Sequence, residues 1–162
     1  MHLRRQLTLF LPEFERRLVD VVRQWLDPKQ SAKIAAHVTL CREAEIANWP
    51  TIQSTLSSLN TIDVKLVFDK PIRLEDGCIM LPTQGSTASY DELRQKILGQ
   101  LYKVQTPHIT LLHPRNSTGR NDDLASLSTY PLPTTVHFTA ISVIEQIEAG
   151  TWNTVECFGV RQ

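Results

Sequence analysis

Apolar and polar residues alternate along several short stretches of the chain, and this period of two is typical of strands with one buried face. On this basis we expect strands at residues 7–11, 34–40, 62–68, 108–112, 135–148 and 152–160. Residues 72–81, IRLEDGCIML, place Asp76-Gly77 between two apolar runs, which predicts a β-hairpin.

Other stretches follow the period of an α-helix. Residues 12–28 predict an amphipathic helix that begins near Pro12 and ends at Asp27-Pro28, because a proline disfavours helix in the residue before it. Its expected buried stripe comprises Phe14, Leu18, Val21, Val22 and Trp25.

Two further helices are expected. One covers residues 90–102, where Ser89 and Glu92 fit a capping box, and a weaker one starts at Pro50 within residues 49–59. The order of helix, short connection, strand and hairpin therefore occurs twice. This order predicts a single α+β domain over residues 1–162, made of two similar lobes that each carry a small sheet backed by helices.

The composition is that of an ordinary soluble protein, with 41% hydrophobic and 21% charged residues. Lys and Arg together number 17 and balance 17 Asp and Glu, which argues against binding along extended nucleic acid. The odd set of three cysteines (Cys41, Cys78, Cys157) shows no C-x-x-C spacing, so we expect neither a disulfide framework nor a zinc cluster. No apolar run approaches membrane length, and we expect a cytoplasmic protein, most simply a monomer.

One four-residue pattern occurs twice, 71 residues apart: His37-Val38-Thr39-Leu40 and His108-Ile109-Thr110-Leu111. In a strand, each histidine shares a face with the threonine two residues later, while the aliphatic residue between them turns to the core. If the lobes are related by an approximate two-fold axis, two imidazoles and two hydroxyls meet in one cleft. One neutral and one protonated imidazole are suited to acid–base chemistry on a phosphodiester. The threonine hydroxyls can donate hydrogen bonds to its non-bridging oxygens.

A simpler interpretation remains open at this point, because a histidine followed by a threonine is common on half-buried strands. A third, shorter copy, His137-Phe138-Thr139, shows that the triplet also arises without the trailing leucine. We expect His137 on a sheet face outside the cleft and Phe138 in the core.

The two longer motifs, HVTL and PHITLL, resemble the paired H-x-T/S motifs of the two-histidine (2H) phosphoesterase superfamily, which includes the 2′-5′ RNA ligase-like proteins and cyclic nucleotide phosphodiesterases. The resemblance extends over nearly the whole chain. It implies a bilobal fold with both motifs facing a central cleft, and metal-independent opening of a 2′,3′-cyclic phosphate or a related cyclic phosphodiester without a cofactor. It also implies that His37 and His108 are the acid–base pair and that Thr39 and Thr110 contact the phosphate.

For several other residues the sequence gives weaker evidence of a place in the site. Some relatives carry a tyrosine after the second motif, where this chain has His113; His113 and Arg115 are candidate substrate contacts. Arg120 lies in the same loop, whereas Arg4, Arg5 and Trp152 are expected to be surface or packing residues, and Cys41 a bystander.

The expected ligand is a nucleotide or RNA end that carries a cyclic phosphate, bound neither along extended nucleic acid nor at a membrane. Two alternatives remain: a 2′-5′ RNA ligase or transesterase that uses the same histidines, and a nucleotide- or RNA-end-binding module with little catalysis.

Overall fold

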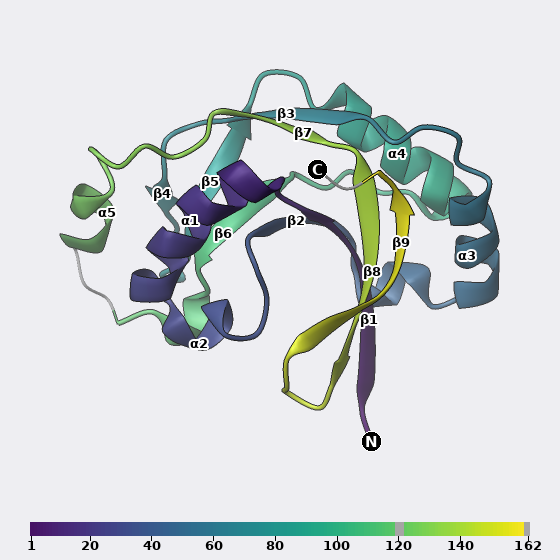
Figure 1. The fold of residues 1–162 in the computed structure, drawn as a ribbon, viewed down its shortest axis with the longest axis horizontal. Coiled ribbons are helices and arrows are strands. Elements are labelled where there is room, and N and C mark those ends of the chain that lie inside the picture. Colours follow the sequence, from purple (N-terminus) through teal and green to yellow (C-terminus); the bar gives the residue numbers. More distant parts are fainter. Residues whose placement is uncertain (119–121, 161–162) are drawn as a thin grey trace.

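The strands of the computed structural model, which describes residues 1–118 and 122–160, form one strongly curled antiparallel sheet (Figure 1). Along the sheet the order is β7-β3-β5-β6-β2-β1-β8-β9, and the short β4 pairs with β5. The strands are β1 (Leu3–Phe10), β2 (His37–Cys41), β3 (Val64–Phe68), β4 (Ile72–Arg73), β5 (Ile79–Gln84), β6 (His108–Leu112), β7 (Thr135–Phe138), β8 (Ala140–Ile147) and β9 (Trp152–Gly159).

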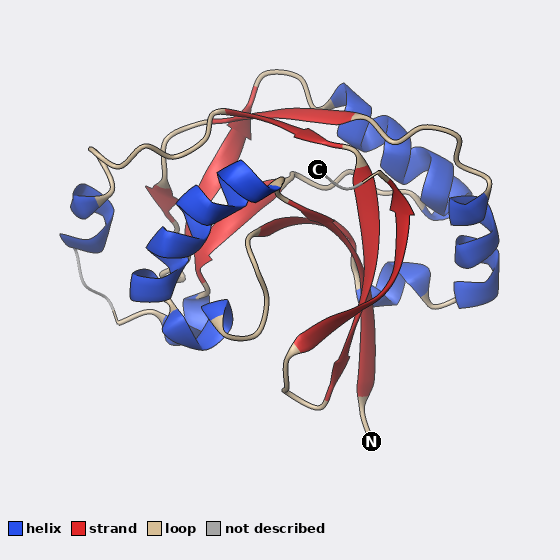
Figure 2. Ribbon diagram, in the orientation of Figure 1, coloured by secondary structure: helices blue, strands red, loops and turns tan. Residues whose placement is uncertain are grey.

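Helices flank the curled sheet at both ends of the view, with α1 and α2 on the left and α3 and α4 on the right (Figure 2). The α-helices are α1 (Glu13–Leu26), α2 (Pro28–Ser31), α3 (Trp49–Ser57), α4 (Ala88–Leu98) and α5 (Asp122–Ser126). Three 3-10 helices complete the described chain: η1 (Glu43–Ile46), η2 (Gly99–Leu101) and η3 (Pro114–Asn116). Within the described residues, none of these helices has both the length and the apolar character needed to span a bilayer.

The two motif strands, β2 and β6, are neighbours at the middle of the sheet. On the β2 side the sheet continues through β1, β8 and β9, and on the β6 side through β5, β3 and β7. The two similar lobes are therefore present, but they are not the two halves of the sequence. The closing hairpin β8–β9 pairs with β1 and so completes the lobe of the first motif, because the N-terminal strand leaves an edge that needs a partner.

The sequence repeat is visible in the order of elements around each motif. A long helix precedes each motif strand, and a 3-10 helix follows each one directly: η1 after β2 and η3 after β6. The long helices pack on the same side of the sheet, α1 against β6 and α4 against β3 and β2. Each long helix therefore packs against the strand that carries the motif of the other lobe.

The core lies between these helices and the sheet face that is opposite the motif histidines. Its central residues are the aliphatic side chains that alternate with the motif residues, Val38 and Leu40 on β2 and Ile109 and Leu111 on β6. The helices contribute Val19, Val22, Tyr90, Leu93 and Ile97. Burying this continuous apolar surface is the main stabilising term for the pairing of the two lobes.

Helix α1 buries only part of the stripe that its periodicity predicted: Val22 is buried as expected, but the other residues of the stripe are not. The buried residues are Val19, Val22 and Arg23, whereas Phe14 is 73% exposed and Trp25 is 48% exposed. The helix carries two adjacent apolar faces, and period alone does not distinguish them. Tertiary contacts select the face that also carries the buried Arg23.

Two local predictions also need correction. Helix α4 begins after Thr87, and Ser89 lies inside the helix, where its hydroxyl bonds to the backbone of Lys65 rather than capping. Residues 135–148 form two strands, because the chain leaves the β3 edge after β7 and crosses to β1 as β8. The polar stretch after residue 115 contains the short helix α5, and Arg120 lies outside the described residues.

The side chains of β7 test the strand register directly. Phe138 is 1% exposed and belongs to the core, while its neighbour His137 is exposed. Phe138→Ala should therefore lower the free energy of unfolding by about 3–5 kcal/mol through lost burial and a residual cavity. The matched surface change His137→Ala should stay within about 0.5 kcal/mol. Urea denaturation of both variants measures this, and equal stabilities would contradict the register.

Candidate active site

The motif strands pair so that their four polar side chains share one face of the sheet. Val38 of β2 is opposite Ile109 of β6 in an antiparallel ladder, and both are 0% exposed. It follows that His37 is opposite Thr110 and that Thr39 is opposite His108. All four motif side chains are partly accessible. The structure thus brings together the four residues that the sequence singled out.

Each motif imidazole is held by a backbone carbonyl two residues earlier. Nδ1 of His37 lies 2.8 Å from the oxygen of Ala35, and Nδ1 of His108 lies 3.2 Å from the oxygen of Thr106. An Nδ1–H that donates to this oxygen leaves Nε2 as the nitrogen that exchanges protons with a ligand. The repeated contact therefore orients both rings in the same way relative to their strands.

The environment of His37 favours its neutral form. Loss of hydration in the cleft lowers the pKa of His37 to about 4, although the bond to Ala35 opposes this shift, and the positive charges of Arg23 and His108 lower it further. The ring of Phe10 meets the His37 ring edge-on at 6.1 Å between centroids. Near neutral pH, His37 is therefore an unprotonated imidazole that can accept a proton.

Hydrogen bonds to the backbone of β2 also hold the first motif in place. The hydroxyl of Tyr90 donates to the carbonyl oxygen of Thr39 at 2.8 Å, and the amide of Gln105 donates both to that carbonyl and to the Tyr90 oxygen. On the cleft side, the amide of Gln6 donates to the hydroxyls of Thr39 and Thr8. These bonds hold Thr39 at its backbone and at its side chain.

A cleft of about 330 Å³ opens over this face, and His37, Thr39 and Thr110 line it. His108 is not among its lining residues and is placed beside them by the strand register, opposite Thr39. The other lining residues include four cations, Arg4, Arg23, Lys33 and Arg115, and one carboxylate, Glu148. A concave site lined by more positive than negative side chains attracts anionic groups. Both sequence candidates of the second loop lie here: His113 and Arg115 line the cleft, and burial followed by the charge of Arg115 lowers the pKa of His113.

Arg4 and Trp152 lie in the cleft, although the sequence did not place them there. Trp152 lines the cleft, and the guanidinium of Arg4 lies over its ring at 5.1 Å from the centroid. The period-two alternation of Arg4 with Gln6 on β1 is the signal that could have placed Arg4 there.

Arg5 points to the other face, where its guanidinium lies 4.5 Å from the Trp49 ring centroid. Cys41 is fully buried, and burial raises the pKa of its thiol to about 12, so it stays protonated.

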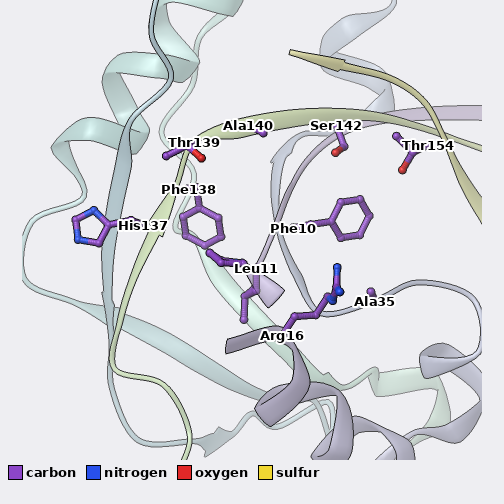
Figure 3. A pocket seen from close by; sticks show the side chains of 11 residues that line it. Phe10, Leu11, Arg16, Ala35, His137, Phe138, Thr139, Ala140, Ser142 and Thr154 are labelled. Carbon is purple, nitrogen blue, oxygen red and sulfur yellow. The ribbon is translucent and has the colours of Figure 1, made fainter. Parts of the chain in front are cut away.

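The third motif copy lies at a different place. His137 lines a separate cavity of about 220 Å³ that shares no lining residue with the cleft (Figure 3). This cavity lies between the end of β1, the start of α1 and the β7–β8 junction, and the side chain of Arg16 extends toward it. The position of His137 outside the cleft agrees with the prediction from the sequence.

No family model matches the chain, and no curated protein matches it in sequence. Solved structures share its fold over nearly the whole length. LigT from E. coli in complex with 3′-AMP has a TM-score of 0.66 at 16% sequence identity and covers 99% of both chains. A structure described as a phosphoesterase has a TM-score of 0.66 at 16% identity, covering 99% of this chain and 100% of its own. TT0787 of Thermus thermophilus has a TM-score of 0.56 at 16% identity and covers 98% of both chains.

These similarities show the fold. The chain has the bilobal α+β fold of LigT, as its resemblance to the 2H phosphoesterases predicted. LigT has also been solved with NADP+, with phosphate and with ATP. All of these ligands of LigT carry phosphoryl groups.

The separation of the two cavities generates a functional prediction. The resemblance to the 2H phosphoesterases implies activity on a 2′,3′-cyclic phosphate. On that expectation His137→Ala should leave kcat/KM within a few-fold of the wild type, because His137 lies on β7 and lines a cavity that shares no residue with the cleft. His37→Ala should lower it by about 100-fold or more, the usual contribution of a positioned acid or base. Both variants are checked for folding by circular dichroism. Inactivation by His137→Ala with normal activity of His37→Ala would show that the wrong motifs had been paired.

Proposed function

We propose that the protein is a 2H-type phosphoesterase that opens a 2′,3′-cyclic phosphate on a nucleotide or an RNA end. The observation that carries the proposal is the placement of two H-x-T motifs on adjacent central strands, with both imidazoles held by the same backbone contact. Because each histidine is opposite the other motif's threonine, the two histidines occupy diagonal positions on one sheet face, and the backbones of such diagonal neighbours are typically about 7–8 Å apart. Side chains at diagonal positions can reach the same small ligand.

The neutral state of His37 supports the role of base for this residue in the proposed reaction. Nε2 of His37 takes a proton from water as the water oxygen forms a bond to phosphorus. The bond from phosphorus to one ribose oxygen breaks, and protonated His108 gives that oxygen its proton. The hydroxyls of Thr39 and Thr110 donate hydrogen bonds to the non-bridging oxygens as negative charge develops. Exchange with solvent then returns both histidines to their starting states.

The surroundings of the motifs support a small phosphorylated ligand. Four cations line one cleft, while the chain as a whole has a formal net charge of +0, so the positive charge is local. This distribution suits a nucleotide or the end of an RNA rather than a long duplex. The phosphoryl ligands found in LigT structures are consistent with the same class of ligand.

The first test is hydrolysis without a metal ion. Among residues 1–118 and 122–160, no three His, Cys, Asp or Glu side chains gather in a way that could hold a metal. Purified protein should hydrolyse 2′,3′-cyclic nucleotides in the presence of EDTA, and His37→Ala and His108→Ala should each cost about 10²–10⁴-fold in kcat/KM. Loss of activity in EDTA with recovery on adding a divalent ion would contradict the mechanism, as would one histidine variant with nearly full activity.

The second test is the pH dependence. Because the folded-state pKa of His37 is about 4, kcat/KM should be maintained as the pH falls from 7 to about 5 and should decline as His37 is protonated near pH 4. An acidic limb centred near 6.5 would show that His37 is not the base, or that its ring is hydrated.

The same shift has a consequence for stability. Between its ordinary pKa of 6.5 and about 4, His37 binds more protons in the unfolded chain than in the folded one, so stability present at neutral pH is lost as the pH falls through this window. His37→Gln should therefore make the urea midpoint less sensitive to acid between pH 6.5 and 4 than it is in the wild type.

A further inference from the structure

Arg23 is a buried cation at the wall of the cleft. It belongs to α1, is 2% exposed and lines the cleft beside His37. Its Nη1 donates to Oδ1 of Asp20 at 3.0 Å, and the same oxygen accepts the backbone N–H of Ala36 at 2.8 Å. Ala36 directly precedes His37. The Asp20–Arg23 pair is thereby fixed to the start of the first motif.

The sequence repeat gives Arg23 a counterpart in the other lobe. Arg23 precedes His37, and Arg94 precedes His108, by the same 14 positions, and each arginine follows an aspartate by three positions, Asp20 and Asp91. The two arginines therefore occupy equivalent places on α1 and α4. Both are almost completely buried.

Protein groups surround the guanidinium of Arg94. It donates to both carboxylate oxygens of Glu45, at 3.2 and 2.7 Å, and to the carbonyl oxygens of Leu40 and Lys103. Both sides of its fork therefore have acceptors, and the residue links α4 to η1. Its role is structural.

Arg23 lacks the equivalent acceptors. The position that corresponds to Glu45 is Asn116, whose side-chain amide donates to Asp27. The carboxylate of Asp27 also accepts the N–H groups of Gln30 and His113. Within the described chain, the hydrogen bond found for the Arg23 guanidinium is the one to Asp20. Arg23 is among the residues that line the cleft.

We propose that Arg23 binds the phosphate of the substrate, donating to a non-bridging oxygen beside His37. This inference rests on the proposed function and adds a third element to the two motifs. A guanidinium donates two parallel hydrogen bonds to a phosphate, and such charge-assisted bonds are stronger in a site with little water. Burial has already removed the hydration of Arg23, so an anionic ligand supplies the acceptors that Glu45 and the carbonyls supply to Arg94.

The other cleft arginines are less suited to this task. Arg4 donates to Gln146, lies over Trp152 and is within 3.5 Å of Glu43. Arg115 donates to Gln30 and is exposed. Both lie where they can attract a ligand toward the cleft, whereas Arg23 is fixed next to the motif.

The experiment compares Arg23→Gln with Arg17→Gln, a variant of an exposed arginine on the same helix that pairs with Glu13. Binding of inorganic phosphate is measured by calorimetry, and kcat/KM is measured with 2′,3′-cyclic AMP. Arg23→Gln should weaken phosphate binding and lower kcat/KM, each by about 10- to 100-fold, the loss expected for one charged hydrogen-bonding partner. Arg17→Gln should stay within about two-fold of the wild type in both.

Arg23→Gln leaves the carboxylate of Asp20 without its cation, so two further variants guard against a loss of folding. Asp20→Asn combined with Arg23→Gln removes both charges and keeps an acceptor for Ala36, and it should show the same loss of phosphate binding. Arg23→Lys keeps the charge without the planar fork and should fall between Arg23→Gln and the wild type.

The binding and turnover measurements separate the two proposals. If the wild type binds phosphate but does not open cyclic nucleotides, the proposed function fails, and the role of Arg23 is decided by the binding data. Wild-type phosphate affinity in a folded Arg23→Gln or double variant would overturn the assignment of Arg23. Absence of phosphate binding to the wild type at millimolar concentration would overturn it as well.

Discussion

The antiparallel pairing of β2 with β6 is the constraint on which the proposed site depends. Val38 and Ile109 face each other in the buried core, so the register of the two strands is fixed by apolar burial rather than by the polar residues. A slip of one strand by one residue would turn its motif to the opposite face and separate it from the other motif. The same side chains that stabilise the fold thereby place His37, Thr39, His108 and Thr110 together.

The two lobes share the positions of their elements but differ in how they support their motifs. Around the first motif, Tyr90, Gln105 and Arg94 bond to the backbone of Thr39 and Leu40. On the other side, Asp27 accepts bonds from His113 and Asn116 and holds the loop after the second motif. One arginine of the repeated pair is therefore enclosed by protein, and the other borders the cleft. A symmetric scaffold in this way yields an asymmetric site, with a neutral imidazole on one strand.

Much of this arrangement could be predicted from the sequence, because the information lies in short patterns. The repeated tetrapeptide identified the four motif residues, alternation placed Phe138 in the core, and the strand at residues 108–112 was predicted with the bounds that the structure has. The buried face of helix α1 was predicted only in part, because the helix has two adjacent apolar faces that share Val22. The choice between them depends on contacts such as the bond from Ala36 to Asp20, which is made only in the folded chain.

Non-local pairing accounts for the other differences. The repeated order of elements predicted two lobes but not which strands complete each one, because β8 pairs with β1 across more than a hundred residues. That pairing also brings Trp152 and Arg4 into the cleft. The residues next to Trp152 in the sequence give no sign of this position. The equal spacing of Arg23 and Arg94 from their motif histidines is visible in the sequence. The different roles of the two arginines could be inferred only from the structure, which shows what surrounds each guanidinium.

A crystal structure of the protein with bound 3′-AMP would show whether the two motifs form one phosphate site. We expect the phosphate between the two histidines, within hydrogen-bonding distance of both Nε2 atoms and of the hydroxyls of Thr39 and Thr110. A phosphate that contacts only one motif, or that lies in the cavity lined by His137, would contradict this expectation.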